Sequence, residues 1–168
     1  MNGTSRIQLI EAANNNNGFA ITLLGVYLIN SQEDVEAGVE MIIRAADGKN
    51  VLWAKNLKLY LRGFINQWQY PIDHHALVDS DAREQLEMYV AEGDYWAMTI
   101  LGDLLYQGRV IPQERDTAEE LLGKAAYLGC SYAKELVSEY GLSANRAIAS
   151  HILDKFKNKN NPKYWMLK

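Results

Sequence analysis

Apolar residues recur at helical spacing along most of this chain. In four segments, apolar or small residues fall at positions i, i+3, i+4, i+7 and i+8, which lie on one face of a helix. The segments are 38–46, 82–90, 118–126 and 144–152. Gln85 interrupts the second stripe, and His151 takes one position of the fourth. The spacing predicts four amphipathic helices, each with one buried stripe.

A second apolar helix is predicted before each striped one, over about 17–30, 50–67, 94–107 and 131–140. Gly48, Gly93 and Gly129 follow three of the stripes and are expected to end their helices in the left-handed conformation. Asp81 and Asp116 are expected to cap helix starts. The pattern therefore predicts an all-α chain of helix-turn-helix pairs, repeating every 35 to 45 residues or so, as in a solenoid.

The segment 94–133 carries the most specific signature. It reads, in order, Ala97, Leu101-Gly102, Leu104, Gly108-Arg109, Pro112-Gln113, Ala118, Leu122, Lys124-Ala125-Ala126 and Gly129. This succession resembles the Sel-one-like repeat, a relative of the tetratricopeptide repeat. The resemblance is weaker over 17–48 and in the other segments. It implies an α-α superhelix of about four helix-turn-helix pairs.

The repeats predicted on this basis span about 17–49, 50–93, 94–129 and 130–156. Together they make one predicted Sel-one-like domain over 1–156, and 157–168 is a basic polar C-terminal tail. The segment 69–78, marked by Pro71, is expected to be a loop inserted into the second repeat.

Charge is distributed unevenly along the chain. The 168 residues are 48% apolar and 23% charged, as expected for one globular domain, and the formal net charge is −4. Residues 1–154 hold 12 Lys and Arg against 21 Asp and Glu, whereas the last 14 residues hold five lysines and no acid. An acidic body argues against nucleic acid as the main ligand. The tail is expected to be solvated or to contact a partner.

Sequence signals for export or for insertion into a membrane are weak in this chain. The first six residues do not resemble a signal peptide, and the longest apolar run, 18–29, is too short to span a bilayer. Cys130 is the only cysteine, so no intrachain disulfide can form. We expect a cytoplasmic protein that does not bind membranes.

Residues suited to catalysis are few. Asp73, His74 and His75, with Asp79 and Asp81, form the densest polar group, but adjacent histidines on a loop point apart and the spacing fits no helical metal motif. We expect surface-loop residues or a partner contact here, and neither a metal nor a cofactor. Cys130 and His151 are expected to be packing residues. Phosphate-binding and nucleophile motifs are absent from the sequence, so an enzyme is not expected.

Binding residues are expected on the first helix of each pair. Tyr95, Thr99, Asp103 and Tyr106 share one face of the helix over 94–107. The helix over 50–67 carries a basic run. It consists of Lys55, Lys58 and Arg62. The resemblance implies that first helices line a concave surface, and Tyr and Arg are enriched at interface hot spots.

These features favour a protein–protein interaction module. Members of the resembled family act as adaptors and scaffolds, and in bacteria as inhibitors or immunity partners of toxins. The partner expected is therefore a protein, with a toxin or effector among the candidates. Two alternatives remain open: a structural subunit of a homo-oligomer, and a metal-dependent enzyme that uses His74 and His75.

Overall fold

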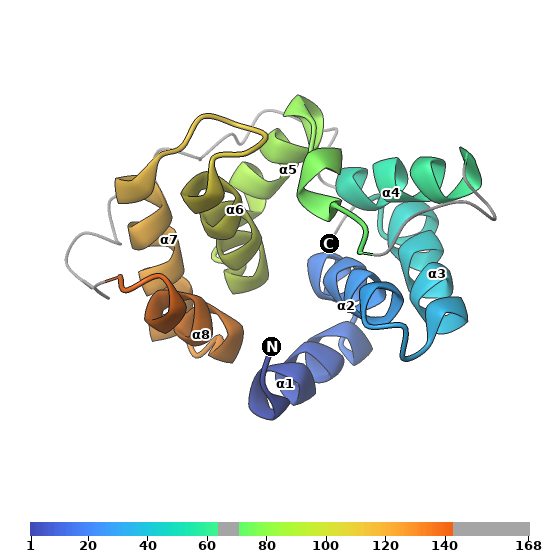
Figure 1. Ribbon diagram of the computed structural model, residues 1–168, viewed down its shortest axis with the longest axis horizontal. Helices are drawn as coiled ribbons and strands as arrows, with labels where there is room; N and C mark the ends of the chain where they lie inside the picture. The colour runs from blue at the N-terminus through green and yellow to red at the C-terminus, as the bar shows by residue number, and fades with distance from the viewer. Residues whose placement is uncertain (64–70, 143–168) are drawn as a thin grey trace. The chain divides into compact units, whose positions relative to one another are not determined.

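The computed structural model describes residues 1–63 and 71–142, and this part of the chain is helical without any strand (Figure 1). The α-helices are α1 (Gly3–Asn14), α2 (Gly18–Asn30), α3 (Val35–Ile43), α4 (Leu52–Gly63), α5 (Ser80–Ala91), α6 (Tyr95–Gln107), α7 (Arg115–Tyr127) and α8 (Ser131–Glu139). A π-helical turn, η1 (Arg44–Gly48), follows α3, and a short 3₁₀ helix, η2 (His74–Leu77), precedes α5. The all-α prediction is confirmed.

The chain divides into two compact units, which are described separately. The described part of unit 1 is residues 1–8 and 83–142, and that of unit 2 is residues 9–63 and 71–82. The boundaries fall inside α1 and α5. The single domain expected over 1–156 stays a prediction.

In unit 2, α2 and α3 form a hairpin whose helices meet at two glycines. A Cβ atom on Gly25 would lie 2.8 Å from the carbonyl oxygen of Gly38, and one on Gly38 would lie 2.7 Å from the carbonyl oxygen of Gly25. Any larger residue at either position would push the two backbones apart. Glycine is therefore required here by close packing.

In unit 1, α6 and α7 form a hairpin of the same construction. Gly102 is the eighth residue of the 13-residue α6, as Gly25 is of the 13-residue α2. A Cβ on Gly102 would lie 2.8 Å from Cγ of Leu122. In each hairpin the glycine faces two adjacent apolar residues of the second helix, Met41 and Ile42 in one and Leu121 and Leu122 in the other.

Their first helices also begin alike. The side chain of Asn17 accepts a hydrogen bond from the backbone N–H of Ala20 at 3.0 Å, and that of Asp94 accepts from the N–H groups of Trp96 and Ala97. Both are N-caps that satisfy otherwise unpaired donors. One turn later, the hydroxyls of Thr22 and Thr99 each donate to the carbonyl four residues back.

One predicted helix end is wrong. Gly93 and Gly129 have positive φ values, as expected, and so has Gly108, but Gly48 does not. The physical reason is the π-helical turn, which extends the helix through Gly48 and leaves the left-handed position to Asn50, with φ 55°. The carbonyl of Ala45 accepts a hydrogen bond from the N–H of Val51, six residues later. In the other hairpin, the carbonyl of Ala125 accepts from the N–H of Cys130, five residues later, so the π-helical turn adds one residue.

Two predicted N-caps also differ from the structure. Asp79, not Asp81, accepts the hydrogen bond from the N–H of Ala82 at the start of α5, at 2.9 Å. The helix α7 begins at Arg115, so Asp116 lies inside its first turn, where an acidic side chain favours the helix dipole.

Several predicted features lie outside the described residues. They are the helix over 144–152 with His151, the end of the fourth repeat, and the tail over 157–168. The opposite case is α1, which the apolar spacing did not predict. Its buried residues in unit 2 are Leu9 and Ala13, whereas Ile7 is 60% exposed.

Candidate protein-binding surface

The predicted binding face of α6 lies against α8. Thr99 is fully buried, and its hydroxyl donates to the carbonyl of Tyr95 at 2.7 Å and lies 3.4 Å from Sγ of Cys130. Asp103 is only 6% exposed. Ten of the 13 residues of α6 are buried. Of the four predicted residues on this face, only Tyr95 and Tyr106 keep partly exposed side chains.

Tyr140 joins α6 to the end of α8. Its hydroxyl is hydrogen-bonded to Oδ1 of Asp103, which also accepts from the side-chain amide of Gln107 at 3.0 Å. The rings of Tyr140 and Tyr106 are stacked, with centroids 3.9 Å apart and planes 11° apart. The Arg115 guanidinium lies 5.2 Å from the Tyr106 ring centroid. Asp103 and Tyr106 therefore hold two helices together.

Burial and acidic neighbours raise the pKa of three groups in or beside α8. Burial is the main cause that raises the pKa of the phenols of Tyr132 and Tyr140, and the hydrogen bond and charge of Asp103 raise that of Tyr140 further. Burial also raises the pKa of the Cys130 thiol. A thiolate is needed for nucleophilic attack, so the chemistry of Cys130 fits a packing residue.

The basic run on α4 is largely engaged within unit 2. The Lys58 ammonium forms an ion pair with Asp47 at 2.7 Å, and that of Lys55 is hydrogen-bonded to the side chain of Asn50. Both partners belong to the segment that precedes α4. Arg62 is exposed near the end of the helix.

The histidine segment packs on α4 instead of standing free. The indole N–H of Trp53 donates to the carbonyl of His74 at 3.0 Å, and the amide of Asn56 donates to that of Leu77 at 2.9 Å. The His74 ring lies 5.9 Å from that of Trp53, and His75 is only 6% exposed. In the parts of the chain that the structure describes, no three His, Cys, Asp or Glu side chains are placed to hold a metal ion.

A surface depression lies along α8 in unit 1. It is shallow, with a volume of about 570 Å³. Its lining residues, here called the α8 groove, are Asn2, Thr4, Ser131, Lys134, Glu135, Ser138 and Glu139. The five from α8 follow the spacing i, i+3, i+4, i+7 and i+8, so they form one polar stripe opposite the buried Ala133 and Leu136. The spacing of these polar residues is visible in the sequence, but a search for apolar stripes does not detect it.

The start of α1 forms the other wall of the groove and is fastened to α8. One carboxylate oxygen of Glu135 accepts from the backbone N–H of Asn2 at 2.7 Å and from the hydroxyl of Ser5 at 2.8 Å. The Gln8 amide donates to the carbonyl of Gly129, and its oxygen accepts from the N–H of Ser131, both at 2.7 Å. Gln8 thus satisfies a free donor at the start of α8.

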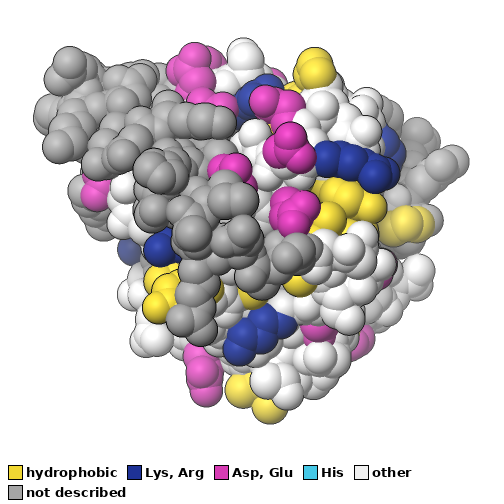
Figure 2. Space-filling model, turned by 90° about the vertical axis from the view of Figure 1, so that its left-hand side faces the viewer, with side chains coloured by type: hydrophobic (Ala, Val, Ile, Leu, Met, Phe, Trp, Pro, Cys, Tyr) yellow, Lys and Arg dark blue, Asp and Glu magenta, His cyan; other side chains and the backbone are white. Residues whose placement is uncertain are grey.

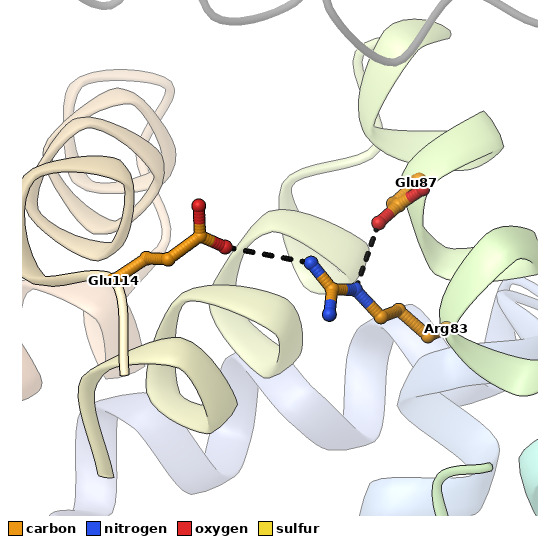
Figure 3. A network of polar contacts seen from close by, with 3 residues as sticks. All are labelled: Arg83, Glu87 and Glu114. Atoms are coloured by element: carbon orange, nitrogen blue, oxygen red, sulfur yellow. Dashed lines mark hydrogen bonds and ion pairs between the residues drawn. The ribbon is translucent and has the colours of Figure 1, made fainter. Parts of the chain in front are cut away.

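A half-buried cation links α5 to the start of α7. The Arg83 guanidinium lies between two carboxylates, 2.9 Å from Glu87 and 3.4 Å from Glu114 (Figure 3). Glu87 is one helical turn further along α5, and Glu114 precedes α7. Arg83 is therefore used in holding the unit together.

Unit 1 has an acidic surface. Residues 1–8 and 83–142 hold 11 Asp and Glu against 6 Lys and Arg. Figure 2 views the molecule from the side on which α7 and α8 lie in Figure 1 and shows acidic side chains at several places, with hydrophobic ones in small separate patches. Surfaces of this kind favour cationic partners.

Comparisons of the chain with family models, curated proteins and solved structures found no match. Across residues 1–63 and 71–142, no helix is both long and apolar enough to cross a bilayer.

Proposed function

We propose that this chain is a non-enzymatic protein–protein interaction module, an adaptor or inhibitor, and that the α8 groove is one of its binding surfaces. The observation that carries the proposal is the depression itself, which runs along the exposed polar stripe of a helix whose other face is buried. Seven residues line it, six on α1 and α8 and one, Asn2, just before α1, and none of them belongs to the packing between α6 and α8 described above.

Repetition of the hairpin supports a superhelix of Sel-one-like or tetratricopeptide-like type. The hairpins α2–α3 and α6–α7 each have a polar N-cap, a threonine and a closely packed glycine at corresponding positions of the first helix. Each is followed by a further helix, α4 or α8. Stacked helix pairs expose a row of helices along which a protein or peptide can dock.

Two chemical observations favour binding over catalysis. The Cys130 thiol is buried and its pKa is raised, and the His75 ring is buried while the backbone of His74 is used in packing. A thiol with a raised pKa is poorly suited to nucleophilic attack, and a buried imidazole lacks the open geometry of a metal ligand. Among interaction modules, a toxin-neutralising inhibitor fits best with an acidic surface, because such a surface can cover a basic one.

Affinity capture tests this proposal. The tagged full chain is compared with Ser138→Trp, which fills the α8 groove without changing charge, and with Thr117→Trp on α7. We expect a stoichiometric partner with the wild type and Thr117→Trp, and its loss with Ser138→Trp. Equal capture by all three proteins would place binding outside the groove.

A further inference from the structure

The two glutamates of the α8 groove are placed unfavourably for α8 alone. Glu135 and Glu139 are four residues apart, a spacing at which like charges on a helix repel each other. Glu139 is also the last residue of α8, at the end where the helix dipole already carries negative charge. Both effects destabilise the isolated helix.

Within the described chain, Glu135 is hydrogen-bonded to neutral groups and Glu139 to none. One oxygen of Glu135 accepts hydrogen bonds from Asn2 and Ser5, which are neutral. No ion pair or hydrogen bond joins the side chain of Glu139 to a described residue, and Arg83, a cation of the same unit, is paired with Glu87 and Glu114. The charge of both glutamates reaches the neighbouring Tyr132, whose pKa it raises.

The groove around these carboxylates leaves room for a ligand. Thr4, Ser131 and Ser138 are small, and their hydroxyls can both donate and accept hydrogen bonds. A cation on a long aliphatic stem reaches such a site while its backbone stays at the surface. Lys134, the one basic residue among those that line the groove, suits an acceptor such as a backbone carbonyl.

We infer that the α8 groove binds a lysine- or arginine-bearing segment of a partner protein, with the cation held between Glu135 and Glu139. The inference rests on the function proposed above and adds the chemistry of the partner. The acidic balance of unit 1, 11 acids to 6 bases, attracts such a segment at long range, and the glutamate pair fixes its position.

Selection from a random peptide library displayed on phage, with the full chain as bait, tests the inference. The selected peptides are synthesised and titrated against the wild type, Ser138→Trp, Glu139→Lys and Glu120→Lys. Glu120→Lys makes the same change of net charge as Glu139→Lys, but on α7, outside the groove. Melting curves by circular dichroism confirm that each variant is folded.

We expect selected peptides to be enriched in Lys and Arg. Their Kd should rise about 5-fold or more in Glu139→Lys and less than about 2-fold in Glu120→Lys, and added salt should weaken binding. Equal losses in both variants would overturn the inference, because net charge alone would then explain binding. Peptides without Lys or Arg that are lost in Ser138→Trp would overturn it while leaving the proposed function intact.

Two further outcomes would also count against the inference. If no peptide is selected, or none depends on Ser138→Trp, both fail at this groove. Light scattering of the chain alone tests whether a second copy of the chain occupies the groove. A dimer that Glu139→Lys dissociates would show this and would overturn the inference.

Discussion

Gly25 and Gly102 each lie where the first helix of a hairpin crosses the second. Replacing Gly25 with alanine puts a Cβ 2.8 Å from a backbone oxygen, and replacing Gly102 puts one 2.8 Å from Leu122. We expect each change to lower the free energy of unfolding by about 1–3 kcal/mol, because the cores must repack. Urea denaturation followed by circular dichroism measures the effect.

Gly48→Ala is the matched control for these glycines. Nothing lies within 4 Å of a Cβ at this position, and its φ is not positive. Stability should be unchanged or should rise by about 0.5 kcal/mol through reduced freedom of the unfolded chain. Equal losses at all three glycines would show that the close crossings are absent in solution.

Tyr140 makes stability depend on alkaline pH. The pKa of its phenol is raised by burial and by Asp103, so the folded chain keeps a proton that the unfolded chain loses above the ordinary pKa of 10.0. Stability is therefore fully present below that pH and should fall as the pH rises above it. Urea midpoints at neutral pH and at about pH 11 measure this fall.

In Tyr140→Phe the alkaline fall should be shallower, since one linked proton is gone. At neutral pH the variant should lose about 1 kcal/mol, because Asp103 loses a hydrogen-bond donor. Tyr127→Phe, which alters a 55% exposed ring, is the comparison for removing any single phenol. A pH profile of Tyr140→Phe that matches the wild type would show that the phenol is not buried against Asp103.

At the level of elements, Gln8 helps to hold the start of α1 on the start of α8. Gln8→Ala removes both hydrogen bonds of its amide, to Gly129 and from Ser131. We expect faster amide hydrogen exchange in residues 2–8 and at Ser131, and a loss of about 1–2 kcal/mol of stability. Ile7→Ala, on a 60% exposed neighbour, should leave exchange unchanged. Unaltered exchange in Gln8→Ala would mean that α1 is held by other contacts.

The helices that the sequence predicts are those with a one-sided apolar stripe. The stripes at 38–46 and 118–126 become α3 with η1, and α7, because one buried face leaves a helical period in the sequence. α1 was missed since its buried side includes Ser5, whose hydroxyl is satisfied by Glu135. Contacts between residues 130 positions apart leave no local pattern.

Candidate site residues were harder to predict for the same reason. Thr99 and Asp103 share a helix face, as expected, but a single sequence does not reveal that α8 covers this face. Polar residues on α8 resemble any solvated helix face. The α8 groove forms because the start of α1 lies beside these residues, which the local sequence does not indicate.

At the scale of the whole molecule, the net charge of −4 opposes association of identical chains. We therefore expect light scattering to give the monomer mass of 19.0 kDa over a wide range of concentrations. A concentration-dependent dimer would favour the alternative of a homo-oligomeric structural subunit.

Binding of a protein at the α8 groove is tested by hydrogen–deuterium exchange of the full chain with and without its captured partner. The partner should slow exchange in residues 131–139 and 2–5, the two walls of the groove. Protection confined to α4 or to η2, with none along α8, would contradict it.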